Sequence, residues 1–537
     1  MKNMNPIFSL KNFRSFGEEG ADFELAPITV LTGCNSAGKS SMAKALMLLS
    51  RMPNRGIISP ALKLYSKDLG LGNYEKVFHK NAADNEIVFA YKVWSNYLQE
   101  EVCVKRFFKS KKNDDLNDGY LYKYTIEKTE GTVILEESTT RWGMGDEEKN
   151  KKNTDSITQN FYAFSLASKY LRLVEIIDLL KKEDDEESQN KYAHYSHELT
   201  DIMSQIQKNG INVEIYNIRQ LTDWYQWINR RNKKKEEYRP FCETDDALTR
   251  FFPEREIIDH YLDLVADEVF NPKFTENVEY IDSTSAAIRR TYSAEDSNKM
   301  SGALLDYNRS KTNDKEWSDV FATDTYYHKP GIFVNHWLEE FLGKGSKINT
   351  TGDDEGSIKV FIERNGEKRL LADEGYGITQ LVSLLLLIDN SIMPANEKKP
   401  QTPWRDGRPD PSKLFFERYP KVICVEEPEV HLHPEYQSKL AMMFVEAYQK
   451  YNIHFIIETH SEYLIRKLQV MVADKKNALS PNDVSLNYVE KDENGVSHNR
   501  QIKIQEDGFL GDSFGPGFFD EATDLSLGLY KIKMGEL

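Results

Sequence analysis

Short apolar runs recur along the chain and are followed by stretches with helical spacing. Residues 26–32 form a β-branched apolar run, and residues 41–49 after it have the pattern of a helix. Two further apolar runs, residues 420–425 and 454–457, have the length and composition of buried parallel strands. The most apolar stretch, residues 381–388, follows a glycine-containing segment and predicts a buried helix. Together these elements predict an α/β fold with a mixed β-sheet.

The middle of the chain is more polar and more helical than its ends. After strand-like residues 85–93 and 131–136 the sequence becomes highly charged. Apolar residues then recur at the spacing of an amphipathic helix, at Leu166, Tyr170, Leu173, Val174, Ile177 and Leu180. Further helix-like stretches follow at residues 197–207, 221–230 and 257–269. We predict a helical insertion that lacks the sustained heptads of a long coiled coil and serves as an arm or as a dimerisation and partner-docking unit.

These patterns divide the chain into four regions. Residues 391–419, which are rich in proline and charge, are expected to form a surface loop within the third region. The expected regions are the N-terminal half of the α/β fold at 1–154, the helical insertion at 155–272, the C-terminal half of the α/β fold at 273–490 and a small C-terminal module at 491–537.

Residues 33–40 match the phosphate-binding pattern Gly-x-x-x-x-Gly-Lys-Ser between the first predicted strand and helix. Backbone N–H groups of such a loop surround phosphates, while Lys39 reaches the outer phosphates and Ser40 offers a hydroxyl to Mg²⁺. A glycine- and serine-rich turn could match by chance, but the flanking strand and helix favour a nucleotide site. The candidate nucleotide-binding residues here are Gly33, Asn35, Ser36, Ala37, Gly38, Lys39, Ser40 and Ser41.

Two carboxylates follow the predicted strand at 420–425. By their order we assign Glu426 to Mg²⁺, together with Ser40, and Glu427 to the attacking water. The strand at 454–457 leads to His460, whose imidazole is expected to hydrogen-bond the γ-phosphate. Two surface glutamates after a strand would be the alternative, but the fixed Pro and His-Leu-His-Pro pattern that follows disfavours it. The expected catalytic residues are therefore Glu427, His460 and Lys39.

These motifs resemble the ABC-type ATPase head shared by SMC proteins, nucleases of the overcoming-lysogenization-defect (OLD) family and related bacterial AAA-type ATPases. In that resemblance residues 33–40 are Walker A, residues 422–427 are Walker B, His460 is the switch histidine and residues 429–434 are the D-loop. A metal-binding role for the histidine pair in the D-loop is the alternative, which the lack of further ligands nearby disfavours.

The segment before the predicted buried helix resembles the signature of ABC heads in its OLD-like form. Its candidate residues are Gly375, Gly377, Thr379 and Gln380. In this family the signature closes over the γ-phosphate held by a second head, so the resemblance implies a homodimer that sandwiches two ATP molecules with Mg²⁺. A higher oligomer stays open. The sequence Glu-Glu at the end of Walker B, in place of Asp-Glu, is expected for the OLD-like branch and disfavours a transporter subunit.

The C-terminal residues 515–521 resemble the Gly-Phe-Phe-Asp module of a group of bacterial ATPases of unknown function. OLD nucleases carry a metal-binding nuclease domain after the ATPase, but the stretch after His460 shows no separate acidic nuclease cluster. A nuclease is therefore expected to be a separate protein.

The net charge of −16 disfavours general DNA coating, although residues 105–112 and 230–235 are locally basic and lie near aromatic residues. Each patch is more simply interpreted as a solvated surface, and DNA contact stays open. The four cysteines form no Cys-x-x-Cys pair, the N-terminus has no signal peptide, and no apolar run is long enough to span a bilayer. These features predict a cytoplasmic protein without a membrane partner.

The function expected from these observations is an ATP-driven dimeric switch that controls a separate effector, with a nuclease in anti-phage defence as the favoured context. The alternative is a DNA-repair or chromosome-associated ATPase that clamps nucleic acid directly.

Overall fold

The computed structural model describes most of residues 1–154 and 273–490 and only parts of the predicted insertion. The described residues are 5–52, 61–66, 69–110, 118–138, 151–152, 186–208, 262, 265–266, 268–270, 272–276, 278–281, 289–292, 301–304, 307–308, 331–352, 357–392, 420–474, 476, 479–515, 518–519 and 521–534.

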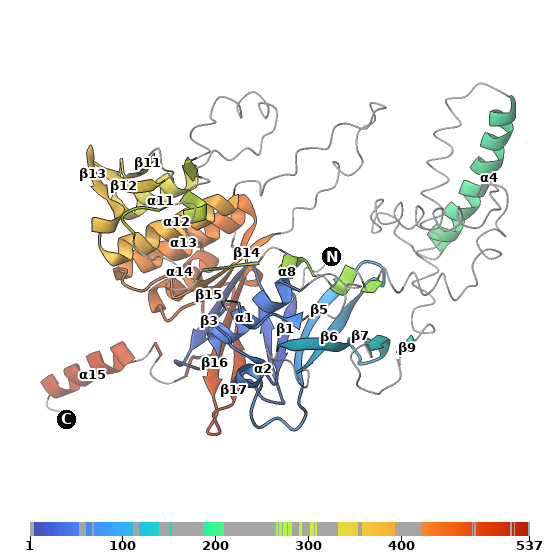
Figure 1. Ribbon diagram of the computed structural model, residues 1–537, viewed down its shortest axis with the longest axis horizontal. Coiled ribbons are helices and arrows are strands. Elements are labelled where there is room, and N and C mark those ends of the chain that lie inside the picture. The colour runs from blue at the N-terminus through green and yellow to red at the C-terminus, as the bar shows by residue number, and fades with distance from the viewer. Residues whose placement is uncertain are drawn as a thin grey trace.

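A six-stranded sheet places the motif-bearing strands side by side (Figure 1). Its order is β10 (Val278–Ile281), β14 (Lys421–Glu426), β15 (Ile453–Glu458), β3 (Ile28–Gly33), β16 (Val484–Lys491) and β17 (Ser497–Ile502). Neighbours are parallel except for the antiparallel β16–β17 pair. The strands predicted near 26–32, 420–425 and 454–457 are confirmed. Because carboxyl ends of parallel strands share one edge, the motifs that follow these strands converge there.

Both faces of this central sheet are covered, which explains why the motif-bearing strands β3, β14 and β15 are apolar without alternation. One face packs with α1 (Lys39–Ser50), the helix predicted after the phosphate loop, and contributes Leu31, Val422, Cys424 and Ile456 to that core. The opposite face contributes Val30, Ile423, Val425 and Ile457 to a second core with the helices of the C-terminal half. The predicted α/β class with a mixed sheet is therefore confirmed.

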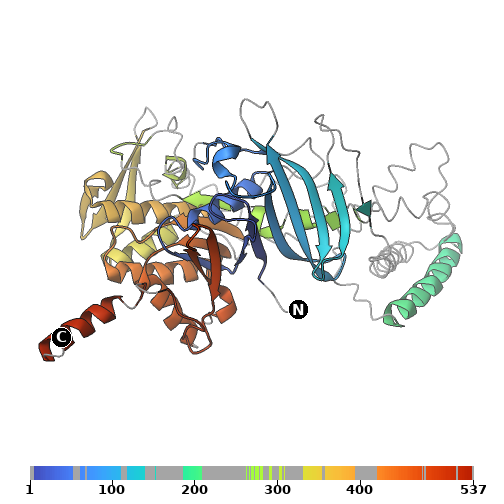
Figure 2. The same ribbon diagram turned by 90° about the horizontal axis from the view of Figure 1, so that it is seen from below.

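An antiparallel sheet lies beyond α1 and is seen broadside in Figure 2. Its order is β2 (Ala21–Glu24), β1 (Ile7–Lys11), β5 (Ile87–Ser95), β6 (Glu100–Ser110), β7 (Gly119–Lys128), β8 (Val133–Ser138) and β9 (Lys151–Lys152), with β4 (Ala61–Leu62) paired to β7. Strands β5 and β8 confirm the strand-like stretches predicted near residues 85–93 and 131–136.

Helices cover the other face of the central sheet, and a small antiparallel sheet lies next to them (Figure 1). The helices are α11 (Ile332–Leu342), α12 (Tyr376–Ile392), α13 (Pro434–Tyr451) and α14 (Glu462–Ala473), and the small sheet has the order β11 (Lys347–Gly352), β12 (Ile358–Arg364) and β13 (Glu367–Leu370). Helix α12 confirms the predicted buried helix, and it extends through Ser391 and Ile392, where a loop was expected to begin. The rest of the predicted loop lies outside the described residues.

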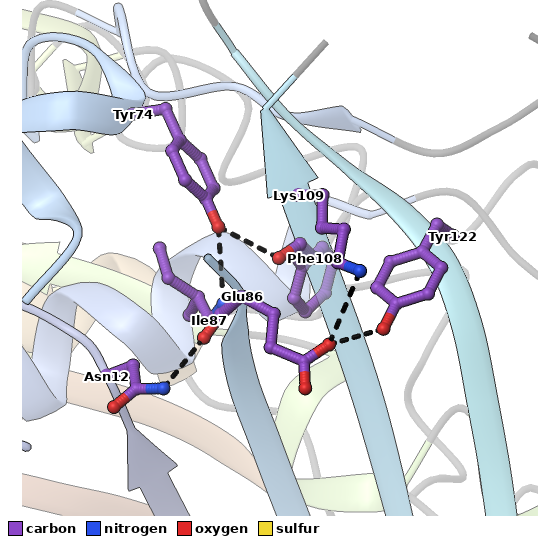
Figure 3. A network of polar contacts seen from close by, with 7 residues as sticks. All are labelled: Asn12, Tyr74, Glu86, Ile87, Phe108, Lys109 and Tyr122. Atoms are coloured by element: carbon purple, nitrogen blue, oxygen red, sulfur yellow. Dashed lines mark hydrogen bonds and ion pairs between the residues drawn. The ribbon is translucent and has the colours of Figure 1, made fainter. Parts of the chain in front are cut away.

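A polar network joins the short helix α2 (Tyr74–Val77) to the antiparallel sheet (Figure 3). The buried Tyr74 hydroxyl donates to the Phe108 carbonyl at 2.9 Å and accepts from the Ile87 N–H at 3.2 Å. Next to it, the Asn12 side-chain amide donates to the Glu86 carbonyl at 3.0 Å, and the Tyr122 hydroxyl donates to the Glu86 carboxylate. The Asn12 bond attaches the loop after β1 to this network, and Ser15 in the same loop lies next to Gly38 of the phosphate-binding loop.

Part of the predicted insertion is described. Helix α4 (Glu186–Lys208) confirms the helical pattern at 197–207, and the described residues between 262 and 270 are helical. The carboxylate of Glu268 accepts bonds from the Ser95 hydroxyl at 2.8 Å and the Asn96 N–H at 3.0 Å, which attach this segment to the antiparallel sheet. The predicted helices at Leu166–Leu180 and at 221–230 lie outside the described residues, and the four region boundaries stay predictions.

Several short elements and the C-terminal helix are also described. They include α8 (Lys273–Glu276), the 3-10 turns η3 (Leu371–Asp373) and η5 (Pro481–Asp483), an isolated bridge between Tyr292 and Ile358, and α15 (Glu521–Met534). None of the helices in the described ranges has the length and apolar character that a membrane crossing requires. Strand β17, which lies inside the region assigned to the C-terminal module, pairs within the central sheet.

Candidate nucleotide site

The phosphate loop lies at the carboxyl end of β3, where two glycines permit close packing. Gly33 has φ 127°, and a β-carbon there would lie 2.0 Å from the Val489 carbonyl oxygen. Gly38 has φ 105°, and a β-carbon there would lie 2.7 Å from the Ser15 hydroxyl. Both positions therefore require glycine for conformational and steric reasons. The loop is held between β16 and the loop that follows β1.

Lys39 opens α1 and folds back over the loop. Its ammonium donates to the carbonyl oxygens of Gly33 at 3.2 Å and Cys34 at 2.9 Å. Ala37, Lys39 and Ser41 are buried, whereas Asn35 and Ser36 are exposed, the latter at φ 60°. Gly38 and Ser40 are of intermediate exposure. The loop thus presents an open backbone at the N-terminus of α1, which suits an anionic phosphate chain.

Carboxylates from two adjacent strands meet this loop. The Ser40 hydroxyl donates to Glu458 Oε1 at 3.0 Å. Glu458 ends β15 and is the register partner of Glu426 at the end of β14. Glu426 accepts a hydrogen bond from the Tyr280 hydroxyl. The residue after it, Glu427, has φ 43° and donates its N–H to the Glu458 carbonyl at 2.8 Å. The two predicted carboxylates therefore lie at one edge of the central sheet together with a third glutamate. Glu426, Glu427 and Glu458 form what we call the acidic edge.

Burial and mutual repulsion shift the pKa values of the side chains in this cluster. Burial raises the pKa of Glu458 to about 7, with Glu426 and Glu427 adding to the rise and the Ser40 hydrogen bond and Lys39 opposing it. Burial lowers the pKa of Lys39, although Glu458 and Glu427 oppose that shift. Burial and the charge of Lys39 lower the pKa of His460. A neutral imidazole therefore lies among charged groups, in electrostatic contact with Lys39 and Glu427.

His460 is positioned by a second acidic side chain. The His460 N–H donates to Glu429 Oε1 at 2.7 Å, and burial raises the pKa of Glu429. The next residue, Ser461, caps α14 by accepting the Leu464 N–H at 3.1 Å, and its hydroxyl bonds to Gln437 Oε1 at 2.6 Å. These contacts attach the segment of the predicted switch histidine to residues 429–434, which follow β14, and to α13.

The predicted signature residues differ in exposure. Gly375 lies exposed just before α12, and its carbonyl accepts the Thr379 N–H at 3.2 Å. Gly377 is buried, and a β-carbon there would lie 2.4 Å from the His431 carbonyl oxygen. Thr379 is fully buried and donates to the Leu371 carbonyl at 3.2 Å, while Gln380 donates to the Glu427 carbonyl at 3.4 Å. Within one chain, therefore, Gly377 and Gln380 hold α12 against the segment that follows β14, whereas Thr379 bonds within its own segment.

The two D-loop histidines have structural contacts. His431 packs edge-on against Tyr376 with ring centroids 4.8 Å apart, and His433 Nδ1 accepts the Glu435 N–H at 3.3 Å at the start of α13. Throughout the described ranges, no group of three or more His, Cys, Asp or Glu side chains is placed to hold a metal by itself. These contacts give each histidine a packing or capping role within its own chain, and the D-loop interpretation stays a prediction.

The C-terminal segment reaches the phosphate loop through one tyrosine. Tyr488 on β16 is hydrogen-bonded to the Cys34 side chain and to the Gly515 backbone, and burial raises its pKa. Phe514 and Phe518 pack on its ring with centroids 5.6 and 5.8 Å away. The Gly-Phe-Phe-Asp region is thus adjacent to the loop that residues 33–40 form.

Three residues at this site had no role in the sequence-based predictions. Glu458 lies in the same short segment as His460, and its place at the end of an apolar strand is the signal that could have identified it. Glu429 was visible as an acid in the D-loop, but its bond to the His460 backbone depends on the fold. Tyr280 comes from the distant strand β10, so only the sheet order reveals its contact with Glu426.

The oxygen atoms of this edge suit a hard divalent cation. Mg²⁺ prefers hydroxyl, carboxylate and phosphate oxygens. Ser40, Glu458 and Glu426 present such oxygens, and Glu458 Oε2 is buried without a hydrogen-bond partner among the described residues. The donor set therefore fits Mg²⁺, which when bound would neutralise phosphate charge.

Comparison with known proteins agrees with the geometry of the site. The model of the AAA ATPase domain family matches residues 7–465, so the chain belongs to that family and is an ATP-hydrolysing enzyme. A second family model, described as a protein of unknown function (DUF3696), matches residues 479–529. Among curated proteins, no sequence matches the chain.

Several solved structures of Smc heads are similar to the chain. A Smc head bound to the C-winged helix domain of ScpA is 11% identical with a TM-score of 0.42, covering 93% of this chain and 98% of that chain. The Smc head of Pyrococcus yayanosii is 12% identical with a TM-score of 0.38, covering 94% and 98%. The head from Thermotoga maritima is 12% identical with a TM-score of 0.33, covering 92% and 97%.

Proposed function

We propose that this ATPase is a switch in which two copies close head to head over two molecules of ATP with Mg²⁺. In each copy Lys39 and the loop at 33–40 bind the phosphates, Glu427 orients the attacking water, and His460 hydrogen-bonds the γ-phosphate. Ser40 and the acidic edge that contains Glu426 hold the cation. Hydrolysis then separates the two heads, because the γ-phosphate that joins them is transferred to water and leaves as inorganic phosphate.

The observation that carries this proposal is the exposed start of α12. Most of that helix is buried in its own chain, but Gly375 and Tyr376 at its beginning are exposed. The first turn of a helix carries unpaired N–H groups and a partial positive charge, which stabilise an anion. The exposed helix start lies within the segment that resembles the signature, and it is available to the γ-phosphate of a second copy.

Introducing a negative charge at Gly375 tests the head-to-head arrangement. We expect Gly375→Glu to bind ATP at its own phosphate loop, to form no ATP-dependent dimer, and to lose turnover by roughly 100-fold, because the new carboxylate would compete with phosphate at the helix start. Sedimentation velocity with and without ATP measures the dimer. No described atom lies within 4 Å of a β-carbon built at Gly375, so the fold should tolerate the change.

Gly302→Glu is the matched control. A β-carbon at Gly302 would also meet open space, and the backbone there lies outside the left-handed region, so the same charge is added without strain. This control should keep both the dimer and the turnover. If Gly375→Glu dimerises on ATP as the unmodified chain does, the head-to-head arrangement is wrong.

We further propose that the closed pair controls a separate effector, with a nuclease in anti-phage defence as the context that the OLD-like motifs support. The C-terminal segment matches a separate family model, and it contacts Tyr488, which lies next to the phosphate loop. Both observations support a role for that segment in transmitting the nucleotide state. The cysteine pattern is consistent with the same proposal in a reducing cytoplasm.

The alternative, a head that clamps DNA directly, depends on the basic patches at 105–112 and 230–235. The patch at 230–235 lies outside the described residues, so the structure describes only part of the patch at 105–112. In its described part, Lys105 pairs with Glu127 at 2.6 Å and Lys109 lies 4.0 Å from Glu86. These carboxylates reduce the positive charge available to phosphates, which favours the switch.

Linear double-stranded DNA should therefore leave ATP turnover of the isolated chain unchanged within about twofold, since patch charges that are already paired release few counterions on binding. Phosphate release is measured with and without DNA at low salt, with Glu427→Gln as the blank. A strong stimulation by DNA would favour the clamp and make Lys105 and Lys109 the residues to replace.

A further inference from the structure

Glu458 is the third acidic residue at the carboxyl edge of the central sheet, and its side chain makes the contact with the phosphate loop. It ends β15 directly beside Glu426, its register partner on β14. Its Oε1 accepts the Ser40 hydroxyl at 3.0 Å across 418 residues of sequence. Ser40 is the residue whose hydroxyl the P-loop pattern assigns to a cation. In this structure, therefore, the acid in contact with that hydroxyl is Glu458.

The second oxygen of Glu458 lacks a partner. The residue is 7% exposed, and Oε2 has no hydrogen bond among the described residues. Burying a carboxylate oxygen without a partner is unfavourable, and here Glu426 and Glu427 repel the same charge. A cation placed at this oxygen would remove both costs.

Glu426 is directed elsewhere. Its Oε1 accepts the hydroxyl of Tyr280, a buried side chain at the end of β10. That bond holds the Glu426 carboxylate toward β10, which is the edge strand. In the sheet order β10, β14, β15 and β3, β10 and β15 lie on opposite sides of β14. Glu458, on the strand next to β3, is the closer acid to the phosphate loop in this order.

From these contacts we infer that Glu458, with Ser40, supplies the protein ligands of the divalent cation that accompanies the nucleotide, while Tyr280 holds Glu426 behind them as an outer partner. This inference rests on the proposed function, which includes Mg²⁺. The described residues contain no self-sufficient metal cluster, so phosphate oxygens complete the coordination.

A different role for Glu458 would be to hold Ser40 in place. Glutamine distinguishes the two roles, because its amide oxygen can still accept the Ser40 hydroxyl but carries no charge for a cation. The readout is the affinity for ATPγS measured in EDTA and again in Mg²⁺, since the ratio of the two dissociation constants reports coupling between metal and nucleotide. Turnover is not needed for this measurement.

For Glu458→Gln we expect the metal-dependent gain in ATPγS affinity to shrink by about 10-fold or more. Affinity in EDTA should stay equal or increase, because one negative charge near the phosphates is removed. Glu426→Gln should reduce the gain less. Glu462→Gln is the matched control and should keep the full gain, because Glu462 is a partly exposed glutamate four residues further along that pairs with Arg466.

The outcomes separate the two levels of the proposal. If the unmodified chain gains no affinity from Mg²⁺, the cation in the proposed function is wrong and the inference fails with it. If the unmodified chain gains affinity and Glu458→Gln gains as much, or Glu426→Gln loses more, only the inference is wrong. Weak binding of Glu458→Gln in EDTA would indicate the structural role instead, and recovery of the metal gain in Glu458→Asp would support ligation.

Discussion

The Lys39→Ala variant should lose ATP turnover by roughly 1,000-fold, which is the largest effect expected from a single substitution in this chain. The Lys39 ammonium is buried over the phosphate loop and is held by the carbonyls of Gly33 and Cys34 at 3.2 and 2.9 Å. From there it can move to the outer phosphates without leaving the loop. Alanine removes the charge and leaves the acidic edge at Glu427 and Glu458 to repel the nucleotide.

Phosphate release and ATP binding should both be measured, because the lysine contributes to both steps. Lys450→Ala is a suitable control: Lys450 is an exposed residue of α13 whose ion pair with Glu446 is a surface contact, so turnover should not change. Lys39→Ala with normal ATP turnover would overturn the assignment of residues 33–40 as the phosphate loop.

The Glu427→Gln variant should bind ATP, lose turnover by roughly 100-fold and accumulate in the closed dimer. Glu427 follows β14 in a left-handed conformation, with its N–H bonded to the Glu458 carbonyl at 2.8 Å. This geometry holds its side chain in electrostatic contact with Lys39 and His460. Glutamine has the same shape but cannot accept a proton from water, so the ATP-bound state would persist.

The measurement is the lifetime of the ATP-dependent dimer, followed after dilution, together with phosphate release. Glu462→Gln again serves as the control for the chemical change, and its dimer should dissociate at the rate of the unmodified chain. A Glu427→Gln dimer that dissociates equally fast, or a variant that hydrolyses ATP normally, would remove Glu427 from the water-orienting role and direct attention to Glu458.

Local sequence patterns predicted the elements of the site correctly because each is encoded over a few consecutive residues. An apolar run ended by glycine or by carboxylates predicted β3, β14 and β15, and helical spacing predicted α1 and α12. The Gly-x-x-x-x-Gly-Lys-Ser pattern identified the phosphate loop for the same reason. Its chemistry depends on backbone N–H groups and two side chains that are adjacent in sequence.

Contacts between those elements were harder to predict. The order of Glu426 and Glu427 in the sequence suggested which acid serves the cation, but order along one strand carries no information about the neighbouring strand. The pattern also did not reveal that the segment around Gly515 packs on Tyr488 next to Cys34. Such contacts depend on which strands are neighbours and on how their ends align.

The sequence by itself thus determined that this protein is a P-loop ATPase with an α/β fold, because the loop and its flanking strand and helix are local. Only the tertiary structure decided which acid meets Ser40. The Ser40–Glu458 bond spans 418 residues and the Tyr280–Glu426 bond spans 146. Strand order and register set both contacts, and these arise from packing two faces of one sheet against separate cores rather than from any local pattern.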